Sequence, residues 1–307
     1  MNPKLSLKAF NRVLSSLDAA RNGRALYALL SAFCVAGLLL ATAESALARG
    51  DGSWGAIWAG LSLAVAFFGV NTTGLLLMDQ ARGRPVRDVV EALGDALRGA
   101  HRVLLGLGLI LLPTGLAVAV LLGLLWAVRL PWIGLPLYAL LVPLGVLLLG
   151  LIAFAGAVLV GPLIGPSVWA GHGARTSARL LLHQLRHGLP EAAVLMAAVL
   201  LLTGMVTAAI SFIVLSGGRA MALLSVWLFD IDVPAQELMA GLFGYGLRSL
   251  GAAGAPVAAS PQGMAALIGG GVVFALALVL PTLVYLRGCC AVFLALQDDE
   301  AATPAAR

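Results

Sequence analysis

Long apolar stretches alternate with short polar segments along the whole chain. A helix needs roughly 20 apolar residues to cross the hydrocarbon core of a bilayer. The stretches that reach this length are 25–46, 54–78, 103–128, 137–161, 191–215 and 264–286. Helices satisfy their backbone hydrogen bonds internally, as lipid requires. The sequence therefore predicts an all-α integral membrane protein with six transmembrane helices. Pro113, Pro143 and Pro281 fall inside these helices, where bundles tolerate kinks.

A basic amphipathic segment precedes the first, third and fifth apolar stretches. Apolar residues recur in these segments at helical spacing: Leu7, Phe10, Leu14 and Leu17, then Val86, Val89, Val90, Leu93, Leu97 and Ala100, then Ala178, Leu181, Leu182, Leu185 and Leu189. The opposite faces carry Lys4, Lys8 and Arg12, then Arg84, Arg87, Glu91, Asp95 and Arg98, then Arg175, Arg179, His183 and Arg186. Period-3.6 spacing with a cationic face predicts helices that lie in the plane of the lipid headgroups.

The chain can be divided into three similar units within a single membrane domain, 1–307. Each unit has an amphipathic helix, a span, an outer turn and a return span, over about 4–78, 86–161 and 174–287. The outer connection 216–263 is longer than the others, and we expect short surface helices at 219–229 and 235–250. The length of this segment fits either a functional lid or a passive insertion.

Lys and Arg are distributed unevenly between the two predicted sides of the membrane. One side holds fifteen: Lys4, Lys8, Arg12, Arg21, Arg24, Arg82, Arg84, Arg87, Arg98, Arg102, Arg175, Arg179, Arg186, Arg287 and Arg307. The other side holds four: Arg49, Arg129, Arg219 and Arg248. Because cytoplasmic loops carry the excess of Lys and Arg, both termini are predicted to be cytoplasmic.

The composition excludes several broad classes of protein. The chain has 307 residues, of which 61% are hydrophobic and 11% charged, and its mean hydropathy is +1.02. Soluble domains are about 45–50% apolar and about 25% charged, so soluble, disordered and fibrous proteins do not fit. Lys4 and Lys8 are the only lysines, and this bias, with many Ala, Leu and Gly, is typical of a GC-rich bacterial genome. We therefore expect a bacterial inner-membrane protein. Nothing in the net charge of +5 indicates nucleic-acid binding.

The amphipathic segments supply the first candidate site. Arginines near an anionic membrane surface are attracted by about 1 kcal/mol each. The predicted headgroup-binding residues are Arg175, Arg179, His183, Arg186, Arg84, Arg87 and Arg98. The expected partners are therefore membrane lipids, anionic ones in particular; a protein partner or homo-oligomer is left open.

The second candidate is the most polar run inside a predicted span, Asn71, Thr72 and Thr73. Such side chains can hydrogen-bond between helices, or they can line a solute path together with Thr114. Asp79 and Arg82 follow at the end of this span, and their spacing predicts an ion pair.

Other motifs indicate no catalytic or metal chemistry. His183 and His187 are four residues apart, as in metal sites, but only His172 is available as a third ligand and no carboxylate or thiol completes the set. No P-loop or GxSxG motif is present. We therefore expect no metal, no cofactor and no enzyme activity. Glu44 near the outer end of the first span fits interfacial snorkelling better than ion coupling. The GxxxG spacing of Gly161 and Gly165 contains a proline and predicts a helix end.

The edge Gly165-Pro166-Ser167-Val168-Trp169, followed by the amphipathic segment 174–188, suggests a family resemblance. In this respect 86–215 resembles a loose group of uncharacterised bacterial inner-membrane proteins and the membrane domain of some glycerophosphoryl diester phosphodiesterases. No hydrolase domain accompanies it here, so the resemblance implies no catalytic residues.

These observations favour a non-enzymatic membrane protein that organises lipid or partner proteins through its basic interfacial helices. The alternative is a transporter or permease subunit for an apolar or lipid-like solute, with Asn71, Thr72, Thr73 and Thr114 along the path.

Overall fold

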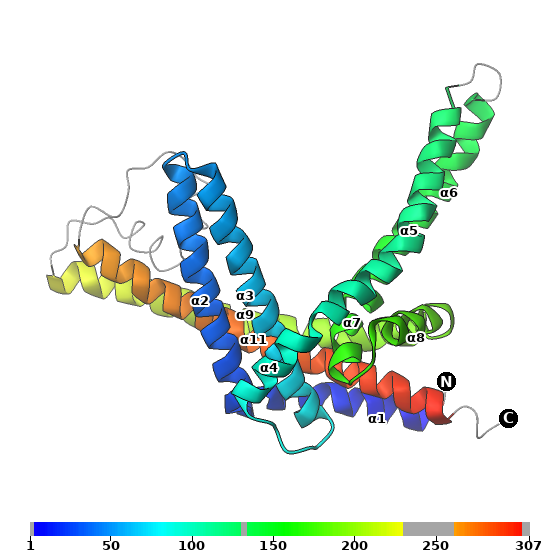
Figure 1. Ribbon diagram of the computed structural model, residues 1–307. Helices are drawn as coiled ribbons and strands as arrows, with labels where there is room; N and C mark the ends of the chain where they lie inside the picture. The colour runs from blue at the N-terminus through cyan, green and yellow to red at the C-terminus, as the bar shows by residue number, and fades with distance from the viewer. Residues whose placement is uncertain (1–2, 130–133, 230–260, 303–307) are drawn as a thin grey trace. The chain divides into compact units, whose positions relative to one another are not determined.

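The computed structural model describes residues 3–129, 134–229 and 261–302, and within these ranges every regular element is a helix (Figure 1). The elements are α1 (Pro3–Leu14), η1 (Ser15–Arg21), α2 (Gly23–Ala48), α3 (Gly52–Ala81), α4 (Val89–Gly99), α5 (His101–Ala127), α6 (Gly134–Ala155), η2 (Gly156–Val160), α7 (Gly161–Trp169), α8 (Ala174–His187), α9 (Leu189–Phe229) and α11 (Pro261–Ala302). The all-α prediction is confirmed.

Six helical segments are long and apolar enough to cross a membrane. They are Gly23–Leu47, Gly52–Ala81, Val89–Ala127, Gly134–Trp169, Leu189–Met221 and Ala275–Asp298, and each overlaps one predicted span. The chain is therefore a multi-pass membrane protein. The three prolines predicted inside spans lie inside α5, α6 and α11.

The helices continue through two places where the sequence predicts that a helix ends. Residues 219–229 continue α9, which runs for 41 residues, because the apolar sequence there contains no proline to end the helix. The other expected surface helix, 235–250, lies outside the described residues. The chain also stays helical through Gly161 and Gly165 to Trp169. Pro162 occupies the first turn of α7, where a missing N–H group is tolerated. The π-turn η2 precedes it, and the N–H of Gly161 bonds the oxygen of Gly156.

The chain divides into two compact units. Unit 1 comprises Met1–Ser16, Gly74–Val199 and Leu286–Arg307, and unit 2 comprises Leu17–Thr73 and Leu200–Tyr285. These two units do not correspond to the three repeated units that the sequence predicts, so the repeat stays a prediction.

In unit 2, small residues allow α2 and α3 to pack closely. A Cβ atom on Gly69 would overlap the Cβ atom of Ala32, so only glycine fits there. Further along this contact, Ser62 Oγ donates a 2.7 Å hydrogen bond to the carbonyl oxygen of Ala36. Close approach at small residues, with hydrogen bonds between helices, is typical of packing in membranes.

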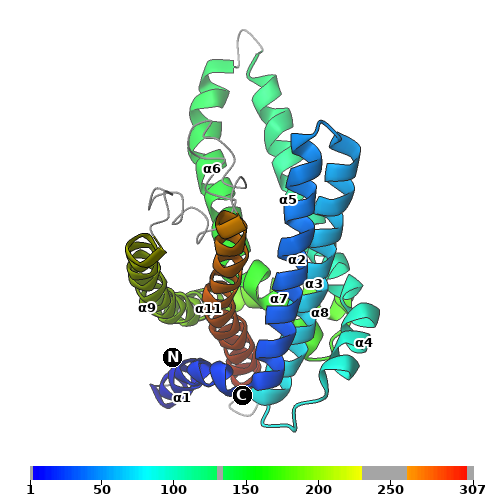
Figure 2. The ribbon, with the colours of Figure 1, turned by 90° about the vertical axis from the view of Figure 1, so that its left-hand side faces the viewer.

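In unit 1, α5 and α6 run side by side (Figures 1 and 2). Leu121 on α5 packs against Gly145 on α6, and both are buried. Most other large apolar residues on these two helices are exposed, as expected for side chains that face lipid. At the base of the pair, α8 packs against α5 and α7.

The second amphipathic helix starts later than the sequence predicts. Gly83 has φ of +66°, a left-handed conformation that favours glycine, and Pro85 follows it. The helix α4 then begins at Val89. Arg84 and Arg87 therefore lie in the segment between α3 and α4, and the prediction that they belong to a helix face is wrong.

Candidate functional site

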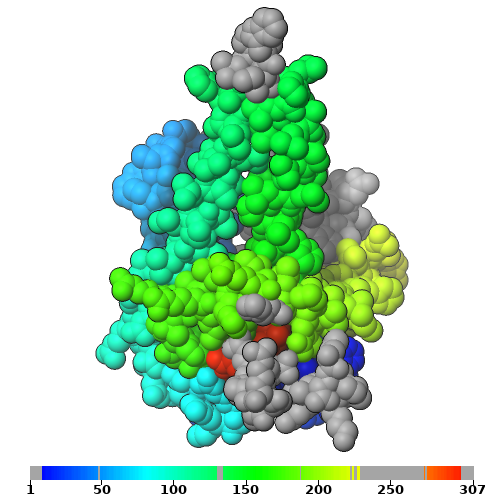
Figure 3. All heavy atoms as spheres, turned by 90° about the vertical axis from the view of Figure 1, so that its right-hand side faces the viewer, coloured from blue at the N-terminus to red at the C-terminus, as the bar shows by residue number. Residues whose placement is uncertain are grey.

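The surface of α8 has a cationic side that is exposed. Arg175, Arg179, His183 and Arg186 are all exposed, and they recur at spacings of three or four residues. Such spacing places them on one side of the helix. Figure 3 shows the face of the molecule along which α8 lies. The structure thus brings together these four predicted residues on one exposed surface, which we call the α8 face.

The opposite side of α8 is buried in the protein. Ala178 and Leu181 are buried, as their apolar character predicts, but Ser177 and Gln184 are buried beside them. The Ser177 hydroxyl and the Gln184 amide have no hydrogen-bond partner among the described residues. The burial of both residues was not predicted, because their polarity suggests exposure. Their spacing from Leu181, four and three residues, was the signal that assigns them to the buried side.

The two sides of α4 have different surroundings. Ala92, Ala96 and Ala100 recur every four residues and are buried. Val90 and Leu97, in contrast, are 76% and 55% exposed. Val90, Leu93 and Leu97 of the predicted apolar face therefore point away from the protein, whereas Ala100 of that face is buried. Arg98 is exposed on the same helix.

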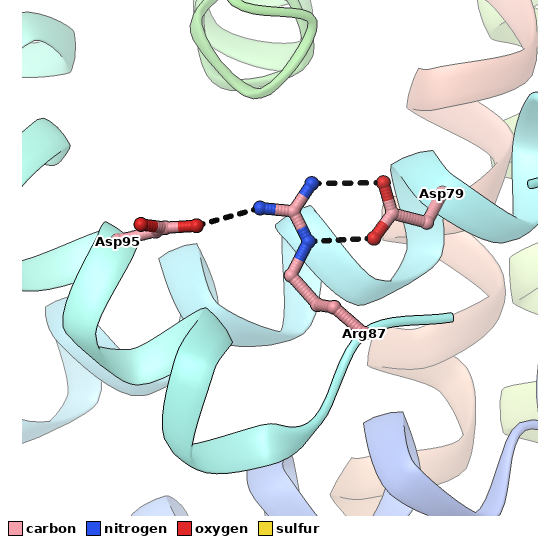
Figure 4. Close-up of polar contacts among 3 residues, drawn as sticks. All are labelled: Asp79, Arg87 and Asp95. Atoms are coloured by element: carbon pink, nitrogen blue, oxygen red, sulfur yellow. Dashed lines mark hydrogen bonds and ion pairs between the residues drawn. The ribbon is translucent and has the colours of Figure 1, made fainter. Parts of the chain in front are cut away.

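Arg87 joins the end of α3 to α4 (Figure 4). Its Nε and NH2 groups donate to the two carboxylate oxygens of Asp79, at 2.7 and 2.9 Å, and NH1 donates to Asp95 at 2.7 Å. The side chain of Asp79 is only 9% exposed. The hydrogen bond that Arg87 donates to Asp79 raises the pKa of Arg87, although partial burial opposes this shift. Asp79 therefore pairs with Arg87, and the predicted Asp79–Arg82 pair is wrong.

Arg82 has a different partner and lines a pocket in unit 1. Its NH2 group donates a 3.2 Å hydrogen bond to the carbonyl oxygen of Ala170, in the turn between α7 and α8. Partial burial, followed by the charge of Arg84, lowers the pKa of Arg82, whereas Asp79 opposes this shift. The pocket has a volume of about 680 Å³ and is lined by Arg12, Ala81, Arg82, Arg84, Ala170, Leu294, Gln297 and Asp298.

Arg12 reaches this pocket from α1. Its NH1 group forms a 2.8 Å ion pair with Asp298 Oδ2 near the end of α11. The two residues are 286 positions apart, so sequence spacing gave no signal for this contact. Helical spacing predicts that Arg12 belongs to the first amphipathic segment, and it does not predict the position of Arg12 beside Arg82 and Arg84.

The polar run of α3 bonds to its own helix. The side chains of Asn71, Thr72 and Thr73 are buried and donate to the carbonyl oxygens four residues earlier. Thr114 lies on α5 in unit 1 and donates to carbonyl oxygens of α5. These bonds satisfy the hydroxyl groups within each helix, and a solute path along the four residues stays a prediction.

The histidine residues were the remaining candidates for metal binding. His183 is exposed on the α8 face, and the side chain of His187 lies outside the described residues. His172 Nδ1 lies 3.0 Å from the carbonyl oxygen of Ser167, and its ring contacts Phe293. Within the described part of the chain, no group of three or more His, Cys, Asp or Glu residues is arranged to hold a metal ion.

Comparison with known proteins adds no family assignment. No family model, curated protein or solved structure matches this chain. The resemblance to the membrane domain of glycerophosphoryl diester phosphodiesterases stays a prediction, and the functional argument rests on the residues themselves.

Proposed function

We propose that this protein is a non-enzymatic multi-pass protein of the bacterial inner membrane that binds anionic lipid and organises lipid or partner proteins. Both termini are cytoplasmic in this proposal, as the uneven distribution of Lys and Arg favours. The observation that carries it is the α8 face, on which Arg175, Arg179, His183 and Arg186 are exposed together.

The α8 face suits a membrane surface better than a single small ligand. Its charges lie along a helix rather than around a cavity, so that successive side chains can meet different headgroups. Each arginine contributes about 1 kcal/mol of attraction to an anionic surface. Three arginines therefore give about 3 kcal/mol, roughly a hundredfold preference for anionic over neutral lipid.

The exposed apolar side of α4 supports the same location. Val90, Leu93 and Leu97 are exposed, and Arg98 is exposed next to Leu97. A helix with exposed apolar residues and adjacent cationic residues is typical of the interface between headgroups and acyl chains. This geometry supports α4 as an interfacial helix, with its alanine side against the protein and its larger residues in lipid.

The experiment measures which lipids surround the full-length protein. The protein is reconstituted into phosphatidylcholine vesicles that contain one fifth phosphatidylglycerol, and energy transfer to headgroup-labelled lipid reports local enrichment. We expect enrichment of phosphatidylglycerol around the wild-type protein. The triple variant Arg175→Gln, Arg179→Gln, Arg186→Gln should lose most of it.

The control removes the same number of charges at exposed arginines on the predicted opposite side: Arg49→Gln, Arg129→Gln, Arg219→Gln. This variant should keep the enrichment of the wild-type protein. If the wild-type protein shows no enrichment, or if the two triple variants behave alike, the proposal is wrong.

A further inference from the structure

The pocket at the ends of α3 and α11 concentrates positive charge from separate parts of the chain. Arg12 comes from α1, and Arg82 and Arg84 come from the segment after α3. Among the lining residues that the structure describes, Asp298 is the only acidic one. These described residues carry three positive charges and one negative charge.

The arginines of this pocket have donor capacity beyond the bonds already described. A guanidinium group carries five N–H donors. The bond to Asp298 uses one donor of Arg12, and the bond to Ala170 uses one donor of Arg82. These two bonds also fix the two side chains in place, so that less conformational entropy is lost when a ligand binds.

The crowding of cations favours a bound anion. Partial burial and then the charge of Arg84 lower the pKa of Arg82, and the charge of Asp79 opposes this shift. An oxyanion between the guanidinium groups of Arg82 and Arg84 would compensate both charges and accept charge-assisted hydrogen bonds from each.

We propose that this pocket binds a phosphate group. Guanidinium groups that converge from different directions match the several oxygens of a tetrahedral phosphate, whereas a planar carboxylate is met by one fork. The volume of about 680 Å³ exceeds that of a phosphate alone and accommodates the remainder of a lipid headgroup or of a small phosphate ester. The inference goes beyond the proposed function, because none of the lining residues lies on α4 or α8.

Two sources of phosphate share this chemistry, and two probes distinguish them. Full-length protein in phosphatidylcholine nanodiscs is titrated with inorganic phosphate by calorimetry. In the second arm, native mass spectrometry counts phosphatidylglycerol molecules retained by the protein. Saturable binding of inorganic phosphate assigns the pocket to a soluble ligand. Retention of a single phosphatidylglycerol without phosphate binding assigns it to lipid, and both results support the proposal.

Substitutions in the lining test the location of the site. Arg84→Gln should raise the Kd of the bound probe about tenfold, the usual effect of losing one charge-assisted hydrogen bond. Arg129→Gln is the matched control, because Arg129 is an exposed arginine of the same unit and lies outside the pocket. It should leave the Kd unchanged.

Asp298→Asn should increase the affinity for the probe, and damage to the fold would not produce such an increase. The Asp298 side chain is 58% exposed, and asparagine removes the one negative charge among the described lining residues while it keeps an oxygen that can accept from Arg12. This variant should bind the probe several-fold more tightly than the wild-type protein.

The proposals for the pocket and for the α8 face can be overturned independently of each other. The variant Arg175→Gln, Arg179→Gln, Arg186→Gln should keep the saturable site in the pocket, even if lipid enrichment is lost. The absence of saturable binding of both probes would overturn the inference, as would equal affinities of the Arg84→Gln and Arg129→Gln variants.

Discussion

At the residue level, Arg87 is the most constrained charge of the second amphipathic segment. Its guanidinium bonds both oxygens of the nearly buried Asp79 and one oxygen of Asp95. Such bidentate pairs combine strength with a fixed geometry. Arg87 was predicted to contact lipid headgroups, but its donors face two carboxylates. Arg87 therefore links α4 to the end of α3 through two ion pairs. The lipid-binding proposal rests on other arginines.

Replacement of Arg87 should destabilise the fold. In Arg87→Leu the carboxylate of Asp79 stays buried without its partner, which should lower the free energy of unfolding by about 3 kcal/mol. Thermal or denaturant unfolding in detergent micelles measures this change. Arg98→Leu, at an exposed position, should shift stability by less than about 0.5 kcal/mol.

The double variant Asp79→Asn, Arg87→Leu tests the cause of this loss. Since it removes the buried negative charge as well, it should recover part of the lost stability. Equal stability of Arg87→Leu and Arg98→Leu would mean that the Asp79–Arg87 pair does not contribute to the free energy of unfolding.

A second residue-level constraint lies where Trp169 covers α3. A Cβ atom on Gly74 would overlap the indole ring of Trp169, and Gly165 lies against the same ring. Both glycines are buried. The indole therefore fits only because both positions lack a side chain.

Gly74→Ala should lower the free energy of unfolding by about 1–3 kcal/mol, because the ring must move to admit the methyl group. Gly60→Ala is the matched control on the same helix, since a Cβ atom there meets no other atom within 4 Å. It should be neutral or stabilising by up to about 1 kcal/mol, as alanine favours helix. Unfolding midpoints of the two variants in the same detergent measure the difference, and similar midpoints would contradict the account.

At the element level, hydropathy predicted the long helices well and the connections poorly. Apolar runs of about 20 residues are sufficient to identify a span, because lipid leaves few alternatives for the backbone. The start of α4 was missed because Gly83 and Pro85 act on the local backbone, which periodicity does not register. Ser177 and Gln184 on the buried side of α8 were missed because their polarity suggests exposure, although their spacing from Leu181 assigns them to that side.

Of the candidate sites, one could be predicted from local sequence and the other could not. The exposed row on α8 could be predicted, since spacings of three and four residues along one helix determine which side chains share a face. The pocket could not be predicted, because Arg12 and Asp298 come from opposite ends of the chain. Whether charged residues from separate elements pair or converge is decided by packing, and a single sequence does not contain that information in a local pattern.

The interfacial position of α4 leads to a test at the element level. Nitroxide labels are placed singly at Val90, Glu91 and Leu97 in a variant that lacks the native cysteines. Labels at Val90 and Leu97 should collide more often with oxygen, which partitions into lipid, than with a water-soluble nickel complex. The label at Glu91 should show the reverse order. Equal accessibility of all three labels to the nickel complex would exclude insertion of this face into the membrane.

At the level of the whole molecule, one topology connects the spans with the basic segments. In the proposed topology, six spans put the N-terminus, the α3–α4 segment, the α7–α8 turn and the C-terminus on one side of the membrane. The uneven distribution of Lys and Arg favours the cytoplasm for that side. The α8 face and the arginine pocket would then meet the same leaflet and the same aqueous compartment, as both proposals require.

Topology mapping tests this central claim most directly. Alkaline phosphatase, which is active only outside the cytoplasm, and a fluorescent protein that matures only inside are fused in turn after Gly50, Gly83, Pro131 and Gly173. The account predicts phosphatase activity at Gly50 and Pro131, and fluorescence at Gly83 and Gly173. Phosphatase activity at Gly83 or Gly173 would place the arginine-bearing segments outside the cytoplasm and contradict the account.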